Sequence, residues 1–341
     1  MDHRIITRWL LLLLLLPGAG VTLGQTRHRV LFYNVENLFD TRDDPMTQDE
    51  EFTPTGNRYW TRARYSRKLQ QLSRTLVAAG SGTLPLFIGL AEVENRQVLL
   101  DLTTKTALAE GDYGVVHADS PDARGIDVAL LYRQEFFHVL TEAFLPVHLE
   151  PTSTTRDILY CKGILQQVDT FHLFVCHFPS MVGGERRSEW KRVLAAGVVR
   201  RKVDSIQQAN QEAAIIVMGD LNGRFNTKAQ RTMRVKAPDN RPIQAGELYN
   251  TSYHLRRATR GSYRYKGKWQ TIDHIIVSGT LLNGEHTWQV NRRMEVFMAD
   301  FLLEEDKNYY GKKPFPTYRG PRYMGGYSDH LPVYVDLSRP F

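Results

Sequence analysis

Residues 213–223 read AAIIVMGDLNG, a run of apolar and β-branched side chains that ends abruptly in polar ones. A run of this length and composition is typical of a buried strand, and Asp-Leu-Asn-Gly is typical of the turn that ends one. Side chains two residues apart at a strand end point to the same side, so Asp220 and Asn222 are expected to face one space. The stretch therefore predicts a buried strand with a polar pair at its end.

Runs of the same kind recur along the chain, and two amphipathic helices are expected between them, at residues 61–79 and 188–208. Hairpin-like strands mixed with helices favour an α+β fold or a mixed α/β sandwich. The expected strands are residues 28–34, 86–92, 126–132, 159–168, 171–177, 213–220, 271–278 and 331–336. The expected apolar stripes of the two helices are Tyr65, Leu69, Leu72 and Leu76 in the first, and Trp190, Val193, Leu194 and Val198 in the second.

The first 24 residues have the three parts of a secretory signal peptide. Arg4 and Arg8 precede an apolar run at residues 10–16, and small residues follow up to Gly24. The run is far shorter than the roughly 18 residues that a membrane span requires. We therefore predict an exported protein, secreted or periplasmic, with a signal peptide at 1–24, one domain at 25–341 and no stable membrane insertion.

The charge balance is modestly basic. The chain carries 44 Lys and Arg residues against 37 Asp and Glu residues, a net charge of +7. In an exported enzyme this balance favours an anionic substrate, such as nucleic acid, a phospholipid headgroup or a cell-surface polyphosphate. The hydrophobic content of 42% is enough to bury a substantial core, which argues against a disordered chain.

Two cysteines occur, Cys161 and Cys176, each in a predicted strand. A turn near Asp169 would place them nearly opposite each other in an antiparallel pair. An exported protein is able to keep a disulfide, but direct cross-strand pairs often fail its distance and dihedral requirements. Two buried thiols are therefore expected.

Polar side chains lie at the ends of the predicted strands or directly beside them. The loops at one edge of a packed sheet are where binding and catalytic sites are assembled. A single such residue is usually a turn former or a helix cap, whereas six in one chain favour a functional site. The six are Asn34, Glu92, His177, Asp220, Asp329 and His330.

Their chemistry suits the hydrolysis of a phosphate ester, which requires a hard cation, an activated water and a donor for the leaving oxygen. Glu92 and Asp329 are candidate Mg²⁺ ligands, because Mg²⁺ prefers carboxylate oxygens and needs only one or two of them. Asp220 and Asn222 are candidates for holding the attacking water and a phosphoryl oxygen.

Two further residues form a candidate acid–base unit. A carboxylate bonded to one imidazole nitrogen selects the tautomer and raises the basicity of the ring. Asp273, within a predicted strand, and His330 are therefore expected to pair. His177 is expected to donate a hydrogen bond to the phosphoryl group.

Residues 300–327 are expected to form a long irregular loop. Loops longer than about 12 to 15 residues are usually functional or disordered. This one runs directly into Ser328, Asp329 and His330, so we expect it to border the site. Its aromatic and basic side chains suit stacked bases and phosphates, but also a sugar or a packed surface. They are Tyr309, Tyr310, Phe315, Tyr318, Tyr323, Lys307, Lys312, Lys313, Arg319 and Arg322.

Taken in order, the motifs resemble those of the endonuclease/exonuclease/phosphatase superfamily, which includes deoxyribonuclease-like and apurinic endonucleases, sphingomyelinases and inositol polyphosphate 5-phosphatases. The likeness covers residues 29–337. It is carried by LFYNVEN at 31–37, LAEVE at 90–94, CHFPS at 176–180, GDLN at 219–222, TIDH at 271–274 and SDH at 328–330. The resemblance implies a four-layer α/β sandwich, with two mainly antiparallel sheets packed face to face and helices outside.

The resemblance also implies the residue roles. Asp220 is favoured for activating the water and His330 for stabilising the phosphoryl charge, although the family leaves open which of the two is the base. Glu94 and Asn37 are alternatives to Glu92 and Asn34. The segment around Arg124 matches the family only loosely, and Asp127 beside it is alternatively a structural turn residue. The expected metal ligands are Asn34, Glu92 and Asp329, the catalytic residues His177, Asp220, Asp273 and His330, and the substrate-binding residues Asn222 and Arg124.

The sequence thus predicts an exported, metal-dependent phosphoesterase, and most simply a nuclease that cleaves phosphodiesters by in-line attack of an activated water. Mg²⁺ is the expected cofactor, with Mn²⁺ or Ca²⁺ as alternatives. The expected partner is an anionic phosphoester, with nucleic acid favoured, and no protein partner is predicted. A phosphatase or lipid phosphodiesterase on the same scaffold is the alternative. A silent binding module is a third reading, but it would have no chemical need for both carboxylates and both histidines.

Overall fold

The computed structural model describes residues 27–149, 154–239, 242–257 and 259–339 of the 341-residue chain. The predicted signal peptide at 1–24 lies outside these ranges. Within them, no helix is both long and apolar enough to cross a membrane.

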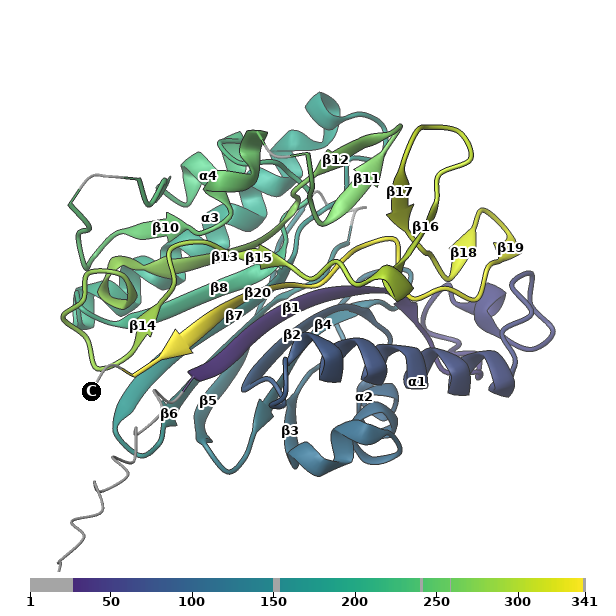
Figure 1. Ribbon diagram of the computed structural model, residues 1–341, viewed down its shortest axis with the longest axis horizontal. Coiled ribbons are helices and arrows are strands. Elements are labelled where there is room, and N and C mark those ends of the chain that lie inside the picture. The colour runs from purple at the N-terminus through teal and green to yellow at the C-terminus, as the bar shows by residue number, and fades with distance from the viewer. Residues whose placement is uncertain (1–26, 150–153, 240–241, 258, 340–341) are drawn as a thin grey trace, which may run out of the picture.

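The first of the two large sheets (Figure 1) has the strand order β14-β20-β1-β2-β4-β3, and β15 also pairs with β20. Strands β1 and β2 are parallel, and the other pairs are antiparallel. Its strands are β1 (Arg27–Leu38), β2 (Phe87–Val93), β3 (Tyr113–Val116), β4 (Asp127–Arg133), β14 (Gln289–Val290), β15 (Glu295–Val296) and β20 (Val333–Ser338).

The second large sheet has the strand order β5-β6-β7-β8-β13-β10-β9. Strands β7 and β8 are parallel, as are β10 and β9, and the other pairs are antiparallel. Its strands are β5 (Phe137–Leu145), β6 (Ile158–Leu165), β7 (Asp169–His177), β8 (Ala214–Asp220), β9 (Val235–Lys236), β10 (Leu248–Asn250) and β13 (Asp273–Ser278). Every predicted strand therefore corresponds to a strand of one of these two sheets.

The helices lie on the outer faces of the two sheets, with α1 and α2 on the first and α3 and α4 on the second (Figure 1). The α-helices are α1 (Arg62–Ala79), α2 (Arg96–Thr104), α3 (Glu185–Ala209) and α4 (Lys228–Thr232). Short 3-10 helices span Glu50–Phe52, Ala107–Gly111, Tyr253–Arg257, Gly279–Leu281 and Asp300–Leu302. The order helix, sheet, sheet, helix confirms the predicted four-layer sandwich.

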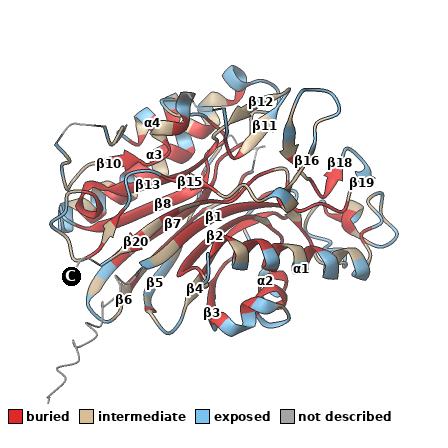
Figure 2. Cartoon of the chain, in the orientation of Figure 1, coloured by how far each residue is buried: buried red, intermediate tan, exposed pale blue. Residues whose placement is uncertain are grey.

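The central strands are buried on both faces, as Figure 2 shows in red. Along β1, Phe32 packs into the core between the sheets, while Leu31 and Tyr33 pack under α1 and α2. Strand β8 does the same, with Met218 between the sheets and Val217 under α3. Burial on both faces explains why these strands read as nearly continuous apolar runs.

Helix α1 buries its predicted stripe except for Tyr65, which is partly buried, but α3 buries a different face from the predicted one. Leu69, Leu72 and Leu76 are buried in α1, whereas Trp190 and Leu194 of α3 are 39% and 42% exposed. The prediction chose the largest apolar residues, yet the helix packs on the sheet through smaller side chains and buried arginines that donate to nearby oxygens. The buried residues of α3 are Ser188, Arg192, Ala195, Ala196, Val199, Arg200, Val203 and Ile206.

The two cysteines are free and buried, as predicted, but they are not opposite each other. Cys161 pairs with Leu173 across β6 and β7. Its side chain packs in the core between the sheets, whereas Cys176 packs in the core beneath α3. Because side chains alternate along a strand, the two thiols lie on opposite faces of one sheet.

The predicted irregular loop at residues 300–327 is wrong, because the segment folds into two hairpins. These are β16 (Leu303–Glu305) with β17 (Lys312–Pro314), and β18 (Tyr318–Arg319) with β19 (Arg322–Tyr323). Several of its cations pair with acidic residues of the same segment, and Tyr318 packs among buried aromatic residues. The ion pairs are Lys312 with Asp300, Lys313 with Glu304 and Asp306, and Arg319 with Glu304.

One remaining hairpin stands above the end of the second sheet (Figure 1). It consists of β11 (Tyr263–Tyr265) and β12 (Lys268–Gln270). An isolated bridge joins Tyr263 to His330. The hairpin is therefore anchored at the point where the chain enters β20.

Candidate active site

Three neighbouring strands of the second sheet place a polar residue at the same edge. Asp220 ends β8, and it pairs in register with His177, the last residue of the parallel strand β7. On its other side Asp220 pairs with Asp273, the first residue of the antiparallel strand β13. Strand direction alone therefore brings together three side chains that are far apart in the sequence.

The first sheet contributes the opposite wall. Asn34 of β1 is in register with Ala91 of β2, and Glu92 follows at an irregularity where its φ angle is +64°. Asp329 and His330 lie just before β20, which runs antiparallel beside β1. Left-handed backbone in a non-glycine residue carries strain that is often stored at functional sites, and here it accompanies the turn of Glu92 toward the second sheet.

The turn before β20 is held in place by Ser328. Its hydroxyl donates to the backbone oxygen of Asn34 at 2.8 Å, and the backbone nitrogen of His330 donates to the Ser328 oxygen at 3.0 Å. The residue order Ser-Asp-His thus has a structural cause, because the serine positions the two functional residues after it.

A pocket of about 680 Å³ opens between these two walls. It contains every predicted site residue except Asn34 and Asp273, which lie behind it. Its lining consists of Glu92, Arg124, His177, Ser180, Met181, Val182, Gly184, Glu185, Asp220, Asn222, Arg224, Tyr263, Tyr265, Gln270, Ile272, Asp329 and His330.

Asp273 and His330 form the expected pair, with Oδ2 of Asp273 2.8 Å from Nδ1 of His330. Burial lowers the pKa of His330, but the charge and hydrogen bond of Asp273, with Asp329 and Asp220 nearby, raise that pKa well above its ordinary value. This environment favours the protonated imidazole, and Nε2 of His330 faces Asp220 Oδ2 at 3.8 Å.

Asp220 lies between two imidazoles. Its Oδ1 accepts from the backbone nitrogen of Asn222 at 2.8 Å and its Oδ2 from Nδ2 of Asn34 at 3.2 Å. Burial and the charge of Asp273 raise the pKa of Asp220 to about 7, while the charge of His330 opposes that rise. A carboxylate with a pKa near neutrality is suited to accept a proton from water.

His177 is the neutral member of the site. Its Nε2 lies 3.9 Å from Oε1 of Glu92 and 3.8 Å from Oδ2 of Asp220. Burial, followed by the charges of Arg156 and Arg124, lowers its pKa well below the ordinary value. A neutral imidazole donates through only one nitrogen, which suits a hydrogen bond to a phosphoryl oxygen.

Glu92 and Asp329 form an acidic pair on the wall of the first sheet. Asn34 Nδ2 and the backbone nitrogen of Asn37 each donate to Glu92, both at 3.1 Å. Burial raises the pKa of Asp329, the cation of His330 lowers it, and the negative charge of Glu92 raises it again. Two repelling carboxylates in a buried pocket fit a divalent cation, which Mg²⁺ would satisfy with few protein ligands and several waters.

The amide of Asn34 is hydrogen-bonded on both sides. Its oxygen accepts from the backbone nitrogen of Glu36 at 3.0 Å, and its nitrogen donates to both Glu92 and Asp220. These bonds position the two carboxylates, and metal ligation by Asn34 stays a prediction. Asn37 takes part through its backbone, and Glu94 points elsewhere, accepting from the backbone nitrogen of Asp40.

Two groups of residues have three potential ligand atoms within 4.8 Å of one another in the described chain, and the first is Asp220, Asp273 and His330. Nδ1 of His330 is already bonded to Asp273, so this group is suited to proton handling as well as to holding a cation. The second is His117, Asp119 and Asp127, outside the catalytic pocket. Asp127 accepts from the backbone nitrogen of Ser120 at 3.1 Å. This bond agrees with the alternative that Asp127 is a structural turn residue.

The two residues expected to bind substrate both line the pocket. Asn222 has a left-handed backbone with φ +46°, and its Nδ2 donates to the backbone oxygen of Phe178 at 3.0 Å. It thus ties the loop after β8 to the loop after β7. The Arg124 side chain is 52% exposed at the pocket mouth, 3.7 Å from Asp122.

Sequence reasoning missed a buried lysine beneath the acidic pair. Lys68 of α1 is 1% exposed, and it donates to Thr317 Oγ1 at 2.5 Å and to the backbone oxygen of Tyr327 at 2.6 Å. Burial lowers its pKa to about 8, against the opposing charges of Glu36 and Asp329. Its position on the same helical face as Leu69 and Leu72 was the available signal, because a lysine on a buried face requires partners.

Glu36 was missed as well. Its carboxylate accepts from the backbone nitrogens of Thr317 and Tyr318 at 2.6 and 2.9 Å. Burial and the charge of Asp329 raise its pKa to about 7. Glu36 therefore links the 300–327 segment to the site, so that segment supports the site from behind and does not line the pocket.

Two tyrosines supply the aromatic wall that was expected from residues 300–327. Tyr263 packs on His330 with ring centroids 4.9 Å apart, and Tyr265 is 51% exposed. Both belong to the β11–β12 hairpin and line the pocket. No separate signal in the sequence distinguished this short hairpin from the other turns.

The sequence pattern of the Endonuclease/Exonuclease/phosphatase family matches residues 29–339. The chain belongs to this family. No significant match to a curated protein was found. As a member of the endonuclease/exonuclease/phosphatase family the chain is a phosphoesterase, and enzymes of the family depend on divalent metals.

Solved structures of the family share the fold. An endonuclease/exonuclease/phosphatase family protein from Bacteroides thetaiotaomicron has a TM-score of 0.57 at 16% identity, covering 93% of this chain and 99% of its own. A humanized TDP2 from D. rerio has a TM-score of 0.55 at 14% identity, covering 91% and 98%. The human Nocturnin catalytic domain with bound sulfate has a TM-score of 0.55 at 16% identity, covering 92% and 95%. At these identities the likeness shows the fold alone.

Proposed function

We propose that this protein is an exported, Mg²⁺-dependent phosphodiesterase that cleaves nucleic acid. The observation that carries the proposal is the hydrogen-bonded pair of Asp273 and His330, which faces Asp220 across 3.8 Å in a pocket that also contains Glu92 and Asp329. One pocket thus combines a proton acceptor, a cation and a site for a metal.

Glu92 and Asp329 would hold the metal, and Asn34 would orient Glu92. When bound, Mg²⁺ would neutralise the phosphoryl oxygens and stabilise the charge of the leaving oxygen. Lys68 and Glu36 beneath these residues hold the acidic wall in place.

Asp220 would take a proton from the attacking water. Its two oxygens are oriented by Asn222 and Asn34, so that the lone pair facing the pocket has a defined direction. His330, kept protonated by Asp273, would stabilise the negative charge that develops on the phosphoryl group. His177 would donate to a phosphoryl oxygen, and Arg124 would add positive charge at the pocket mouth.

The pocket walls favour nucleic acid over a small phosphomonoester. The exposed ring of Tyr265 and the ring of Tyr263 offer stacking surfaces for bases. Arg124 and Arg224, whose side chains are 52% and 64% exposed, flank the opening and suit the phosphates of a strand. Aromatic and cationic side chains in one pocket match the chemistry of a nucleotide chain.

The test compares hydrolysis of double-stranded DNA, single-stranded DNA, RNA, bis-p-nitrophenyl phosphate and p-nitrophenyl phosphate, each with Mg²⁺ or with EDTA. We expect EDTA-sensitive cleavage of nucleic acid, abolished in His330→Ala. Activity confined to the monoester would instead assign a phosphatase. Equal rates for His330→Ala and the wild type would refute the assigned site.

Export is a separate part of the proposal, and it rests on the predicted signal peptide at 1–24. Expression of the full chain with its leader, followed by N-terminal sequencing of the protein outside the cytoplasm, tests it. We expect a mature N-terminus close to Gln25. A protein that stays in the cytoplasm and begins at Met1 would contradict export while leaving the chemistry untouched.

A further inference from the structure

A second pocket lies directly beside the catalytic pocket, and the proposed reaction does not use it. Its volume is about 520 Å³. The two pockets share Arg124, Ser180 and Val182 in their walls. A substrate bound in the catalytic pocket therefore has a direct path into the second one.

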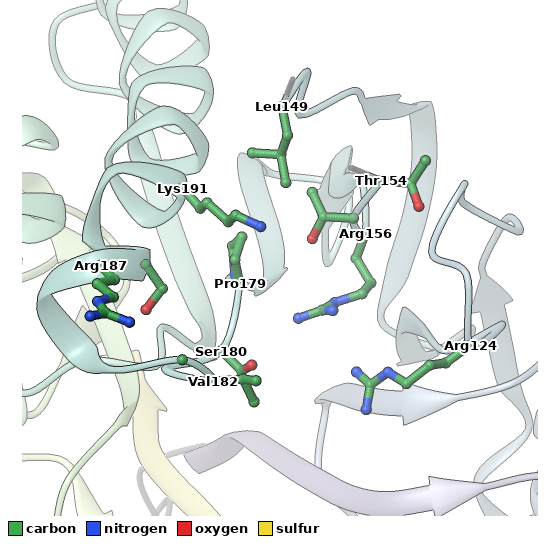
Figure 3. A pocket seen from close by; sticks show the side chains of 12 residues that line it. Arg124, Leu149, Thr154, Arg156, Pro179, Ser180, Val182, Arg187 and Lys191 are labelled. Atoms are coloured by element: carbon green, nitrogen blue, oxygen red, sulfur yellow. The ribbon is translucent and has the colours of Figure 1, made fainter. Parts of the chain in front are cut away.

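The second pocket is cationic. Arg124, Arg156, Arg187 and Lys191 line it, and no carboxylate is found among its described lining residues. In Figure 3 the side chains of Arg124, Arg156 and Lys191 point into the hollow from different segments of the chain. The catalytic pocket, in contrast, is lined by four carboxylates, so the pair of pockets separates a metal-binding half from an anion-binding half.

The charges of Arg124, Arg156 and Arg187 are only partly compensated within the described residues. The carboxylate of Asp122 lies 2.8 Å from Arg156 and 3.7 Å from Arg124, so one negative charge serves two arginines. Arg187 is exposed and makes no ion pair within the described residues. An anionic ligand would restore the balance of charge.

Two buried polar atoms in the wall also lack a partner within the described chain. They are Oγ1 of Thr155 and Nε of Arg156, in residues that are 3% and 6% exposed. Buried donors without an acceptor cost free energy, and native proteins keep few of them. A phosphate oxygen is the acceptor that the surrounding cations favour.

The first turn of α3 forms the remaining wall. This helix has 25 residues, and its N-cap Gly184 provides no side-chain hydrogen bond to the free amides. The buried side chain of Arg192 draws in the backbone oxygens of Pro179, Ser180 and Glu185. The uncapped amides at the start of this long helix favour an anion.

We propose that the second pocket binds another phosphate of the same substrate, next to the phosphodiester that is cleaved. This proposal rests on the phosphodiesterase function proposed above and extends it to substrates with at least two phosphates. The second phosphate is either the next internal phosphate of a strand or a terminal phosphate. Substrate length and phosphorylation, and not base sequence, would then determine cleavage efficiency.

The experiment measures kcat/KM with Mg²⁺ for the thymidine dinucleotide TpT, for its forms phosphorylated at the 5′ or the 3′ end, and for the trinucleotide TpTpT. A version of TpTpT with one neutral methylphosphonate linkage removes the charge of one internal phosphate. We expect at least one two-phosphate substrate to be cleaved about tenfold or more better than TpT, because a hydrogen bond to a charged group contributes that much. If TpTpT has the higher kcat/KM, the second phosphate is internal. If an end-phosphorylated TpT has it, the second phosphate is terminal.

Two variants test whether the higher kcat/KM of two-phosphate substrates depends on the second pocket. Arg187→Glu should remove it while leaving bis-p-nitrophenyl phosphate, which has one phosphate, unchanged. The matched control is Arg186→Glu, the same charge change at the preceding exposed residue, which does not line the pocket. Thr155→Val removes only the unpartnered hydroxyl, so it should reduce the advantage while the melting temperature stays the same or rises.

A binding assay separates failure of this inference from failure of the proposed function. Fluorescence anisotropy of a labelled 12-nucleotide strand, with EDTA and His330→Ala to prevent cleavage, reports binding alone. Arg187→Glu should weaken binding about tenfold more than Arg186→Glu and lower the salt dependence by about one counterion. If that difference appears but no phosphodiester is cleaved, the second site stands and the proposed reaction fails. If Arg187→Glu matches Arg186→Glu on every two-phosphate substrate and in binding, the second site is refuted.

Discussion

Replacement of Asp273 by Asn would change one charge at the centre of the site. The Asp273 carboxylate lies 2.8 Å from Nδ1 of His330 and, against the opposing effect of burial, holds the pKa of His330 well above 6.5. Asparagine keeps the size of the side chain and removes the charge. Because His330 stays buried, its pKa should fall, and a larger fraction of the imidazole would be neutral at neutral pH.

The expected loss follows from the role of that cation. Removing one donor to the developing charge of a transition state lowers kcat by about 10² to 10³, or about 2.7 to 4 kcal/mol. The charge of Asp273 also helps to raise the pKa of Asp220 to about 7, whereas the charge of His330 lowers it. The substitution weakens both effects, so they oppose each other at Asp220 and the acidic limb of the activity profile should move little. Because His330 acts when protonated, the basic limb should move to lower pH.

The assay is kcat/KM for bis-p-nitrophenyl phosphate across the neutral range, for the wild type, Asp273→Asn and a control. Asp300→Asn is the matched control, because the Asp300 side chain is 90% exposed. Melting temperatures would establish that all three proteins are folded. A folded Asp273→Asn variant with the rate and pH optimum of the wild type would falsify the assigned roles of Asp273 and His330.

The remaining tests concern the metal, the buried lysine and the aromatic wall. In a Mg²⁺ titration of activity, Glu92→Gln should cost several kcal/mol of transition-state stabilisation. Glu94→Gln should not, because burial raises the pKa of Glu94 to about 8 and the change to Gln then removes little charge. Lys68→Met should destabilise the protein by about 3–5 kcal/mol in urea unfolding, since it strands a buried charge, and adding Glu36→Gln should recover part of that loss. Tyr265→Ala should weaken binding of single-stranded DNA by about 1–3 kcal/mol with hydrolysis of bis-p-nitrophenyl phosphate unchanged. Equal effects of the two glutamate variants, or no effect of the other two, would contradict the respective roles.

Much of the fold could be predicted because strands buried on both faces leave a clear record in the sequence. The run before Asp220 and the run before Glu92 are almost entirely apolar, and each ends at a polar residue that lines the pocket. Order and spacing of these strand ends were enough to indicate the family. The buried face of α3 was mispredicted because Trp190 and Leu194 have the larger apolar side chains, yet close packing on a sheet selects Ala195 and Ala196.

The site was only partly predictable, because several of its residues depend on neighbours that are distant in the sequence. Lys68 lies in no motif, and Glu36 had no predicted role within the motif at 31–37. The charges of both matter because they act on Asp329. The aromatic wall was assigned to the wrong segment, since residues 300–327 and the β11–β12 hairpin have similar compositions. Only three-dimensional packing shows that Tyr318 is buried while Tyr265 lines the pocket.

The sequence by itself determined the strands, the sandwich and the identity of the polar residues at the strand ends, because periodicity and turn signals are local properties of the chain. Tertiary structure decided which of those residues meet. Parallel pairing of β7 with β8 and antiparallel pairing of β8 with β13 place His177, Asp220 and Asp273 side by side. The protonation states follow from that arrangement, since burial and the distances between charges exist only in the folded chain.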